Sequence, residues 1–113
     1  MKNEIAYFEI VAKDAARLHR FYEATFDWKL ESGPMPNYVS ITTGGASALR
    51  GGIRQEEGAK PDRVMYVRVA NLEETLARVT KAGGKVLIPP MQVAGVTFAL
   101  FLDPEGNTMG IIL

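Results

Sequence analysis

Ionisable and phenolic side chains occupy matching places in the two halves of this sequence. Tyr7 and Glu9 lie in a short run of β-branched and aromatic residues, and Tyr66 and Arg68 follow 59 positions later (66 − 7) in a second such run. Arg50 stands just before a glycine pair. A carboxylate can act as a general base, a phenol as an acid, and a guanidinium can bind an anionic or carbonyl group. These five residues are therefore candidates for acid–base catalysis or for binding a polar ligand.

Other reaction chemistries lack the residues they need. The sequence has no cysteine, which excludes disulfides, thiolate metal sites and a cysteine nucleophile. His19 is the single histidine and falls on the polar side of a predicted helix, so sites built from several histidines and a Ser-His-Asp arrangement are excluded. The pairs Gly44-Gly45 and Gly51-Gly52 do not open helices and so do not form a phosphate-binding loop.

Composition predicts one small globular domain. The chain has 113 residues, of which 47% are hydrophobic, and 13 basic residues balance 13 acidic ones. A net charge of zero argues against nucleic-acid and membrane-surface partners, because both are attracted by a positive field. No apolar run approaches the ~20 residues that span a bilayer, and the N-terminus lacks the features of a signal peptide. We therefore expect a cytoplasmic protein with no nucleic-acid or membrane partner.

The elements that must position the candidate residues follow a repeated order of strand, helix and three strands. Asp14 predicts an N-cap for a first helix, and Asn71, with Glu74 three residues on, predicts a capping box for a second. The pair Pro89-Pro90 is interpreted as a break between strands. The predicted strands cover residues 5–11, 28–31, 38–42, 46–53, 64–69, 85–88, 96–102 and 108–113, and the helices cover residues 14–25 and the stretch from Asn71 to the glycines at 83–84.

The repeat divides the chain into two modules of one domain. Gly52-Ile53 and Gly110-Ile111 match at a shift of 58 (110 − 52). The prediction is a single domain over residues 1–113, with module one at 1–54, a polar linker at 55–62 and module two at 63–113. A module with one helix and one small sheet buries little surface by itself, so the two halves are expected to complete each other's core.

The same residues, taken in order, resemble the vicinal oxygen chelate superfamily, which holds glyoxalase I, bleomycin-resistance proteins and extradiol dioxygenases. The motifs that carry the resemblance are Tyr7-Phe-Glu-Ile10 with Asp14, Phe21-Tyr22, Phe26-Asp27-Trp28, Gly83-Gly84 and Asp103-Pro-Glu-Gly-Asn107. The resemblance implies an α+β fold in which two βαβββ modules form a curved mixed sheet around a cleft, with the helices on the outer face. It also implies a homodimer, because small members of this family usually pair.

Metal enzymes of that family use four ligands, a histidine or glutamate from the first and last strands of each module. In this sequence those places fall at Tyr7, Gly52, Tyr66 and Gly110. Glycine has no side chain to offer, and tyrosine, with a pKa near 10, is a poor ligand for a divalent ion at neutral pH. We therefore expect no metal and no other cofactor.

Strand alternation then assigns side chains to the cleft. If Tyr7 faces the cleft, Phe8 and Ile10 lie under the helix. The predicted ligand-binding residues are Tyr7, Glu9, Arg50, Gly52, Tyr66, Arg68 and Gly110. Glu9 and Arg68 are expected to form an ion pair. The two tyrosines are expected either to fill space or to contact a ligand. The glycines are expected either to keep the cleft floor clear for a flat molecule or to form bulges.

Three functions are compatible with this pattern. The first is a metal-free protein that binds a small planar or aromatic molecule, whose anionic group could meet Arg50. The second is a lyase, isomerase or dioxygenase-type enzyme in which Glu9 is the base and Tyr7 or Tyr66 the acid; a neighbouring Arg68 would work against it, because a cation lowers the pKa of a carboxyl. The third is a purely structural or partner-binding module. No catalytic residue is assigned.

Overall fold

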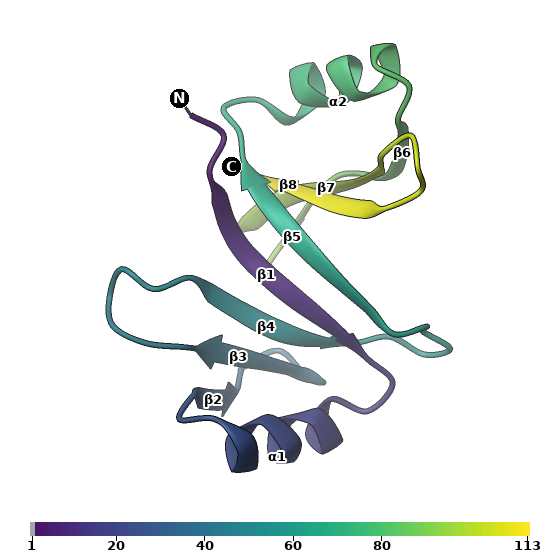
Figure 1. Cartoon of the computed structure of the whole chain (residues 1–113). Coiled ribbons are helices and arrows are strands. Elements are labelled where there is room, and N and C mark those ends of the chain that lie inside the picture. Colours follow the sequence, from purple (N-terminus) through teal and green to yellow (C-terminus); the bar gives the residue numbers. More distant parts are fainter. Residues whose placement is uncertain (1) are drawn as a thin grey trace. The chain divides into compact units, whose positions relative to one another are not determined.

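The computed structural model describes residues 2–113, which form eight strands and two helices. Figure 1 shows the order strand, helix and three strands twice along the chain. The elements are β1 (Ile5–Ala12), α1 (Ala15–Thr25), β2 (Lys29–Ser32), β3 (Tyr38–Thr42), β4 (Arg50–Gln55), β5 (Asp62–Arg68), α2 (Leu72–Lys81), β6 (Lys85–Val93), β7 (Val96–Leu102) and β8 (Thr108–Ile112). The predicted α+β class and doubled βαβββ order are confirmed.

The chain divides into two compact units. The N-terminal unit is Tyr7–Val64, and the C-terminal unit combines residues 2–6 with Met65–Leu113. Residues 2–6 belong to the C-terminal unit because the Arg68 amide donates to the Glu4 carbonyl at 2.8 Å and the Asn3 side chain donates to the Arg68 carbonyl at 3.1 Å. The division thus differs at its edges from the predicted modules, whose first module began at residue 1. The predicted single domain and the predicted cleft both concern the two units together and stay predictions.

The N-terminal unit has a mixed sheet in the order β2-β3-β4-β1, in which β1 runs parallel to β4 and the other neighbours are antiparallel. Asp14 caps α1, since its carboxylate accepts from the Arg17 amide at 3.1 Å. Ala15 of α1 packs on a buried cluster that includes Val39, Ile41 and Ile53, with partly buried side chains around it, among them Phe8, Ile10, Leu18, Tyr22 and Trp28. The prediction that Phe8 and Ile10 lie under the helix is confirmed.

The C-terminal unit repeats this arrangement in the order β5-β8-β7-β6, with β5 parallel to β8. Asn71 caps α2 by accepting from the Glu74 amide at 2.8 Å, as the capping-box spacing predicted. Leu72 and Leu76 of α2 pack on Ala99 and Ile111 of the sheet. The helix α2 therefore covers one face of the sheet, and the opposite face is not covered by it.

The prediction of a strand break at Pro89-Pro90 is wrong. β6 continues through both prolines to Val93, with irregular pairing to β7 between Ile88 and Met91. Proline cannot donate a ladder hydrogen bond, so it is tolerated where a strand has a partner on one side only. β6 is the outer strand of the sheet in its own unit, which provides that place.

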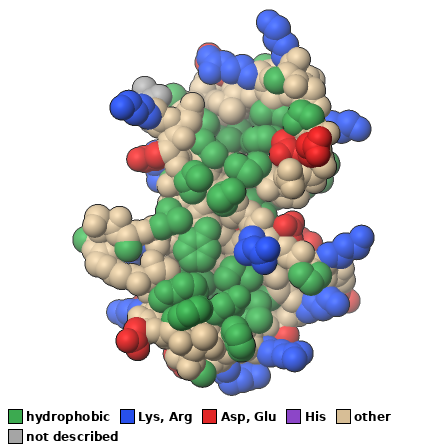
Figure 2. Space-filling view, viewed as in Figure 1, with side chains coloured by type: hydrophobic (Ala, Val, Ile, Leu, Met, Phe, Trp, Pro, Cys, Tyr) green, Lys and Arg blue, Asp and Glu red, His purple; other side chains and the backbone are tan. Residues whose placement is uncertain are grey.

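Hydrophobic side chains are not confined to the core. Figure 2 shows green side chains gathered in the lower part of the view, where Figure 1 places α1 and the strands β2 to β4, with charged side chains around them. Phe21 is 56% exposed and Phe26 is 48% exposed on this half of the chain. They join an aromatic group in which the rings of Phe26 and Trp28 lie 4.8 Å apart.

Candidate functional site

The polar candidates of the N-terminal unit lie on the sheet face opposite α1. Strand register aligns Tyr7 with Arg50 and Glu9 with Gly52, and it aligns Tyr38 with Arg54 one step further along. Paired residues of neighbouring strands share a face, and so do residues two apart on one strand. β1, β3 and β4 therefore bring two phenols, one carboxylate and two guanidinium groups onto one surface.

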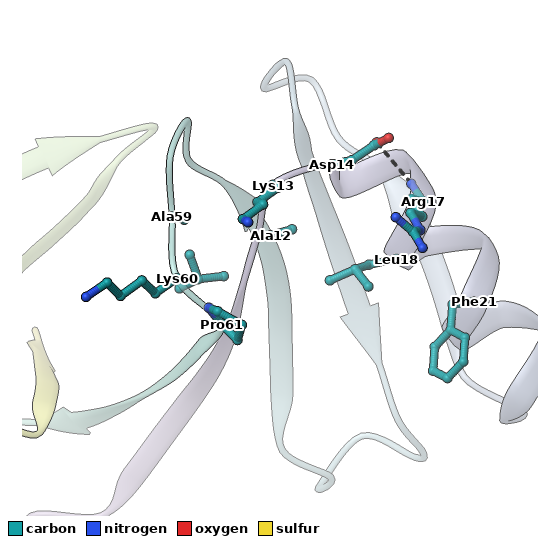
Figure 3. A pocket seen from close by; sticks show the side chains of 10 residues that line it. Ala12, Lys13, Asp14, Arg17, Leu18, Phe21, Ala59, Lys60 and Pro61 are labelled. Atoms are coloured by element: carbon teal, nitrogen blue, oxygen red, sulfur yellow. Dashed lines mark hydrogen bonds between the residues drawn. The ribbon is translucent and has the colours of Figure 1, made fainter.

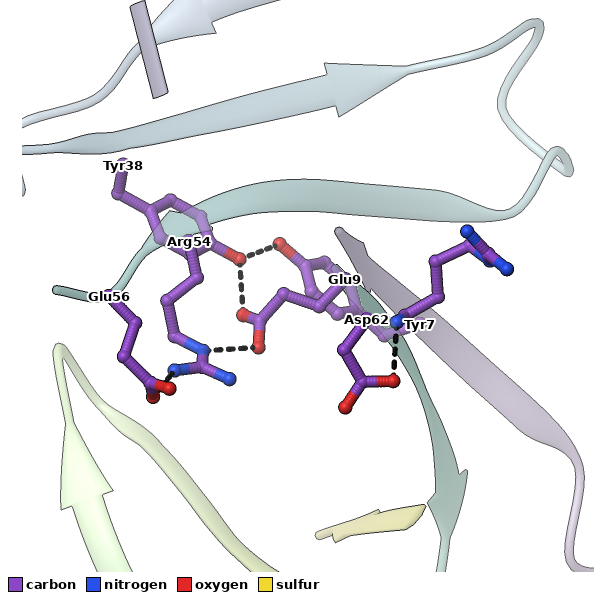
Figure 4. Close-up of polar contacts among 7 residues, drawn as sticks. Tyr7, Glu9, Tyr38, Arg54, Glu56 and Asp62 are labelled. Atoms are coloured by element: carbon purple, nitrogen blue, oxygen red, sulfur yellow. Dashed lines mark hydrogen bonds and ion pairs between the residues drawn. The ribbon is translucent and has the colours of Figure 1, made fainter. Parts of the chain in front are cut away.

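Four of these side chains, with Glu56 beyond them, form one hydrogen-bonded network (Figure 4). The Tyr38 hydroxyl donates to Glu9 Oε2 at 2.9 Å, and Arg54 Nε donates to Glu9 Oε1 at 3.0 Å. A second nitrogen of Arg54, Nη1, forms an ion pair with Glu56 Oε1 at 2.6 Å. The Tyr7 and Tyr38 hydroxyl oxygens lie 2.5 Å apart. We refer to Tyr7, Tyr38, Glu9, Arg54 and Glu56 together as the Glu9 network.

The direction of each hydrogen bond in the network, which we call its proton order, follows from the number of protons available. A phenol has one proton, and that of Tyr38 goes to the Glu9 carboxylate. The hydrogen bond between the two phenols must therefore use the Tyr7 proton, with the Tyr38 oxygen as acceptor. Tyr7 donates to Tyr38, Tyr38 donates to Glu9, and Arg54 donates to the other oxygen of the same carboxylate.

The environment keeps both phenols protonated. Burial raises the pKa of Tyr38, and the nearby Glu9 charge raises it further. Burial also raises the pKa of Tyr7, the hydrogen bond between Tyr7 and Tyr38 works in the opposite direction, and the Glu9 charge adds to the rise. Burial would lower the pKa of Arg54, but its hydrogen bonds and charge pairing with Glu56 and Glu9 outweigh that and raise it. The network thus holds neutral phenols beside a paired carboxylate and guanidinium.

This geometry suits a fixed binding surface better than proton transfer. Glu9 is only 6% exposed, and a buried carboxylate is costly unless donors satisfy it. Each of its oxygens accepts a hydrogen bond from this chain, one from a phenol and one from a guanidinium. The two donors hold this carboxylate in place and satisfy its charge where burial leaves little water to do so.

The three in-strand glycines have a role that the sequence did not show. A Cβ placed on Gly52 would overlap the Tyr38 hydroxyl and would lie 2.6 Å from the Tyr7 hydroxyl. A Cβ on Gly51 would overlap the Phe8 ring on the opposite face, and a Cβ on Gly110 would overlap the Tyr66 ring.

The interpretation that Gly52 and Gly110 keep a cleft floor clear is therefore wrong, because the protein's own tyrosines fill the space above them. An aromatic ring laid over a glycine restores the contacts that a strand loses where it has no side chain.

The C-terminal unit has a different surface on the face opposite α2. Register places Leu100 and Ile88 beside Tyr66 and Gly110, and it places Phe98 and Met91 beside Arg68 and Ile112. The Tyr66 and Phe98 rings meet edge to face, with centroids 6.3 Å apart. This face is mainly aromatic and aliphatic, whereas the face that carries the Glu9 network is rich in hydroxyl groups, with Ser40 and Thr42 beside the two phenols.

Two predictions about the arginines stay predictions. Arg68 Nη1 donates to the Leu113 carbonyl at 2.7 Å, and its Nε lies 3.8 Å from Glu4 Oε1. The expected Glu9–Arg68 pair would join the two units. Arg50 is exposed, and within residues 2–113 no carboxylate forms an ion pair with it. An exposed guanidinium can be reached by a ligand.

Sequence reasoning missed three members of the network: Tyr38, Arg54 and Glu56. Arg54 was within reach, because it lies two residues beyond Gly52 and so shares its face. No sequence signal places Tyr38 on this face. Its place depends on the pairing of β3 with β4, which sequence alternation does not give.

The donor set does not fit the metal site that the family resemblance implies. In the N-terminal unit the corresponding corners hold a tyrosine and a glycine, Tyr7 and Gly52, and in the C-terminal unit they hold Tyr66 and Gly110. Across residues 2–113 there is no group of three or more His, Cys, Asp or Glu side chains that could hold a metal ion. The described residues therefore do not fit that metal centre. No helix among the same residues is long and apolar enough to cross a membrane.

The fold defines a class of protein: paired βαβββ units, each with a helix on one face of a mixed sheet. Residues 4–111 match the family model of the Glyoxalase/Bleomycin resistance protein/Dioxygenase superfamily. The chain belongs to this superfamily. It is also 32% identical over 127 aligned positions to a "Glyoxylase-like domain-containing protein" of Didymella fabae, an alignment that covers 98% of this chain and 94% of that protein.

Solved structures show the same fold at low sequence identity. The Mn(II)-bound glyoxalase from Novosphingobium aromaticivorans superposes with a TM-score of 0.71 at 22% identity, covering 97% of this chain and 38% of that one. The homoprotocatechuate 2,3-dioxygenase of Brevibacterium fuscum superposes with a TM-score of 0.71 at 16% identity, covering 98% of this chain and 36% of that one. This chain therefore matches little more than a third of either protein, and the likeness concerns the fold alone.

Proposed function

We propose that this protein is a binding protein for a small planar or aromatic molecule with an anionic group, and that it lacks the metal centre of its enzymatic relatives. The observation that carries the proposal is the hydrogen bonding of Glu9. Both oxygens of this buried carboxylate accept from the protein's own Tyr38 and Arg54, which supports a role in holding a binding surface in place over a role as a general base.

The sheet face of the N-terminal unit offers suitable contacts for such a ligand. Tyr7 and Tyr38 are held in place by each other and by Glu9, so they present pre-positioned aromatic and hydroxyl groups. Arg50 lies beside Tyr7 in the strand register and is exposed. A guanidinium can bind a carboxylate with two parallel hydrogen bonds. Gly52 belongs to this face as the position over which the phenols lie.

The equivalent face of the C-terminal unit is proposed to bind apolar groups. Tyr66 lies over Gly110 and against Phe98, and Arg68 has its guanidinium engaged by Leu113 and Glu4. Aromatic surfaces of this kind bind planar molecules through stacking and edge contacts. Tyr66 and Arg68 are therefore the proposed ligand contacts of this unit, and Gly110 contributes to the site by making room for the Tyr66 ring.

The experiment compares an aromatic acid with its uncharged counterpart. 1-Naphthoate and 1-naphthamide are titrated into the whole protein, and binding is measured by NMR chemical shifts and by the rise in melting temperature that a native-state ligand causes. Arg50→Gln should weaken naphthoate binding by about three- to tenfold, the range expected for one partly exposed charge contact, and should leave naphthamide unchanged.

Arg63→Gln is the matched control, because Arg63 is an exposed arginine of the same unit. An equal loss in both variants would mean that naphthoate responds only to overall charge. The enzyme alternative makes its own prediction: one stoichiometric divalent metal per purified chain, or turnover that Glu9→Gln abolishes, would overturn the proposal.

We also propose that the protein works as a homodimer, as small members of the superfamily usually do. Light scattering coupled to size-exclusion chromatography measures the mass directly. A mass of about 12.4 kDa at micromolar concentration would contradict this part of the proposal, since that is the mass of one chain.

A further inference from the structure

A cavity lies in the N-terminal unit, away from the Glu9 network. Its volume is about 460 Å³, and it is bounded by the end of β1, the first turns of α1 and the loop segment Ala59–Pro61 (Figure 3). None of its lining residues belongs to the Glu9 network or carries any of the ligand-binding predictions made above. The volume falls within the ~300–1,000 Å³ range that is usual for small-molecule sites.

The inner wall of the cavity is apolar. Val11, Ala12 and Ala59 are 8%, 3% and 6% exposed, so they form a fixed floor. Leu18 and Phe21 extend from α1 along one side, with Phe21 more than half exposed at the rim. An exposed phenylalanine on the edge of an apolar hollow loses contact with water when a hydrophobic ligand covers it.

The charges around the cavity are mainly positive. Lys13 and Arg17 both line it, and within residues 2–113 no carboxylate forms an ion pair with either. Asp14 is the acidic residue at the same place, and its carboxylate is engaged as the N-cap of α1 by the Arg17 amide. The Lys60 side chain extends away from α1 in Figure 3, so it is not counted among the cations of the cavity.

We propose that this cavity binds an amphipathic carboxylate, specifically an aliphatic acid whose chain lies on the apolar floor and whose carboxylate meets Lys13 and Arg17. Charge complementarity selects an anion over a cation, and the buried alanine and valine side chains select an aliphatic chain over a polar body. This site is separate from the proposed function, because it uses different residues on a different part of the same unit.

The test titrates decanoate into the isotopically labelled whole chain, with decanol as the uncharged ligand of equal chain length. Chemical-shift changes should concentrate at residues 11–13, 17–21 and 59–61. The double variant Lys13→Gln/Arg17→Gln should weaken decanoate binding about tenfold and leave decanol within about twofold, because two exposed charge contacts are lost and the apolar floor is kept.

Arg20→Gln provides the matched control, since Arg20 is an exposed arginine of α1 that does not line the cavity. It should leave decanoate affinity within about twofold of the parent protein. Shift changes centred on another surface, equal losses in the Arg20 variant and the double variant, or the absence of saturable decanoate binding would each overturn the proposal. Arg50→Gln should leave decanoate binding unchanged. The test of this cavity is therefore independent of the naphthoate test of the proposed function.

Discussion

Removing the Tyr38 hydroxyl tests the proton order of the Glu9 network. In Tyr38→Phe the ring stays over Gly52, but Glu9 Oε2 loses the donor at 2.9 Å and the Tyr7 hydroxyl loses its acceptor at 2.5 Å. In Tyr7→Phe the bond between the phenols is lost, and Glu9 keeps its bonds from Tyr38 and Arg54. The two substitutions each remove one oxygen atom, so the difference between them measures the bond to the carboxylate.

The expected magnitudes follow from the type of each bond. A hydrogen bond to a charged group contributes about 1.5–3 kcal/mol and a neutral one about 0.5–1.5 kcal/mol. Tyr38 is partly exposed, so water replaces part of what is lost, and the lower ends of these ranges apply. Tyr38→Phe loses both bonds and should therefore lower the free energy of unfolding by about 2 kcal/mol, whereas Tyr7→Phe loses the neutral bond and should lower it by about 0.5 kcal/mol.

Equilibrium unfolding in urea provides the assay, followed by the fluorescence of Trp28, the single tryptophan. Trp28 packs on the core of the N-terminal unit, so its signal reports the unit that holds the network. Tyr22→Phe is the matched control, with an expected change below about 0.5 kcal/mol, the usual limit for substitutions that remove no buried partner. A loss in Tyr7→Phe equal to or larger than that in Tyr38→Phe would refute the proton order.

Three further predictions concern the glycines, high pH and the turn before β8. Gly110→Ala should destabilise the protein by about 1–3 kcal/mol in urea, because its methyl group would overlap the Tyr66 ring, whereas Gly45→Ala, which has open space, should change stability by under about 1 kcal/mol. The raised pKa values of the two phenols in the Glu9 network stabilise the fold below pH ~10, and this contribution should be lost as pH rises through their folded-state values. A tyrosinate absorbance titration should show these phenols ionising above pH ~10 while the chain is folded; ionisation of all tyrosines near pH ~10 in the folded chain would contradict it. Hydrogen bonds from Asn107 lower the pKa of Asp103, so Asn107→Ala should move that pKa up toward its ordinary value in an NMR titration, and no movement would show that other donors hold it.

The fold was within reach of sequence analysis because its signals are local. Asp14 and Asn71 satisfy helix N-termini a few residues away, and apolar spacing assigns one face of each helix and strand to the core. The alternation rule placed Phe8 and Ile10 under α1 correctly. The prediction of a strand break at Pro89-Pro90 was wrong, because a proline interrupts a strand only where a neighbouring strand needs its amide as a hydrogen-bond donor. The local sequence does not show which strand lies at the edge of its sheet.

The candidate site was only partly predictable because its contacts join distant residues. The bond between Tyr38 and Glu9 spans 29 positions, and that between Arg54 and Glu9 spans 45. No periodic pattern relates such pairs. The sequence indicated that Glu9 needs a partner and predicted Arg68, because the repeat relates these two positions. The repeat gave no sign of Tyr38 or Arg54 as partners, because it says nothing about β3 or about the pairing of β1 with β4.

The sequence by itself determined the doubled strand and helix order, the caps, the buried faces and the unsuitability of Tyr7, Tyr66 and two glycines as metal ligands. These properties depend on residue type and short-range spacing, which are fully present in the chain. Only the tertiary structure decided that the tyrosines lie over the glycines, that Glu9 is held by Tyr38 and Arg54, and that an apolar cavity forms beside Lys13 and Arg17. Each of these depends on strand register and on side-chain packing, which arise when segments far apart in the sequence meet.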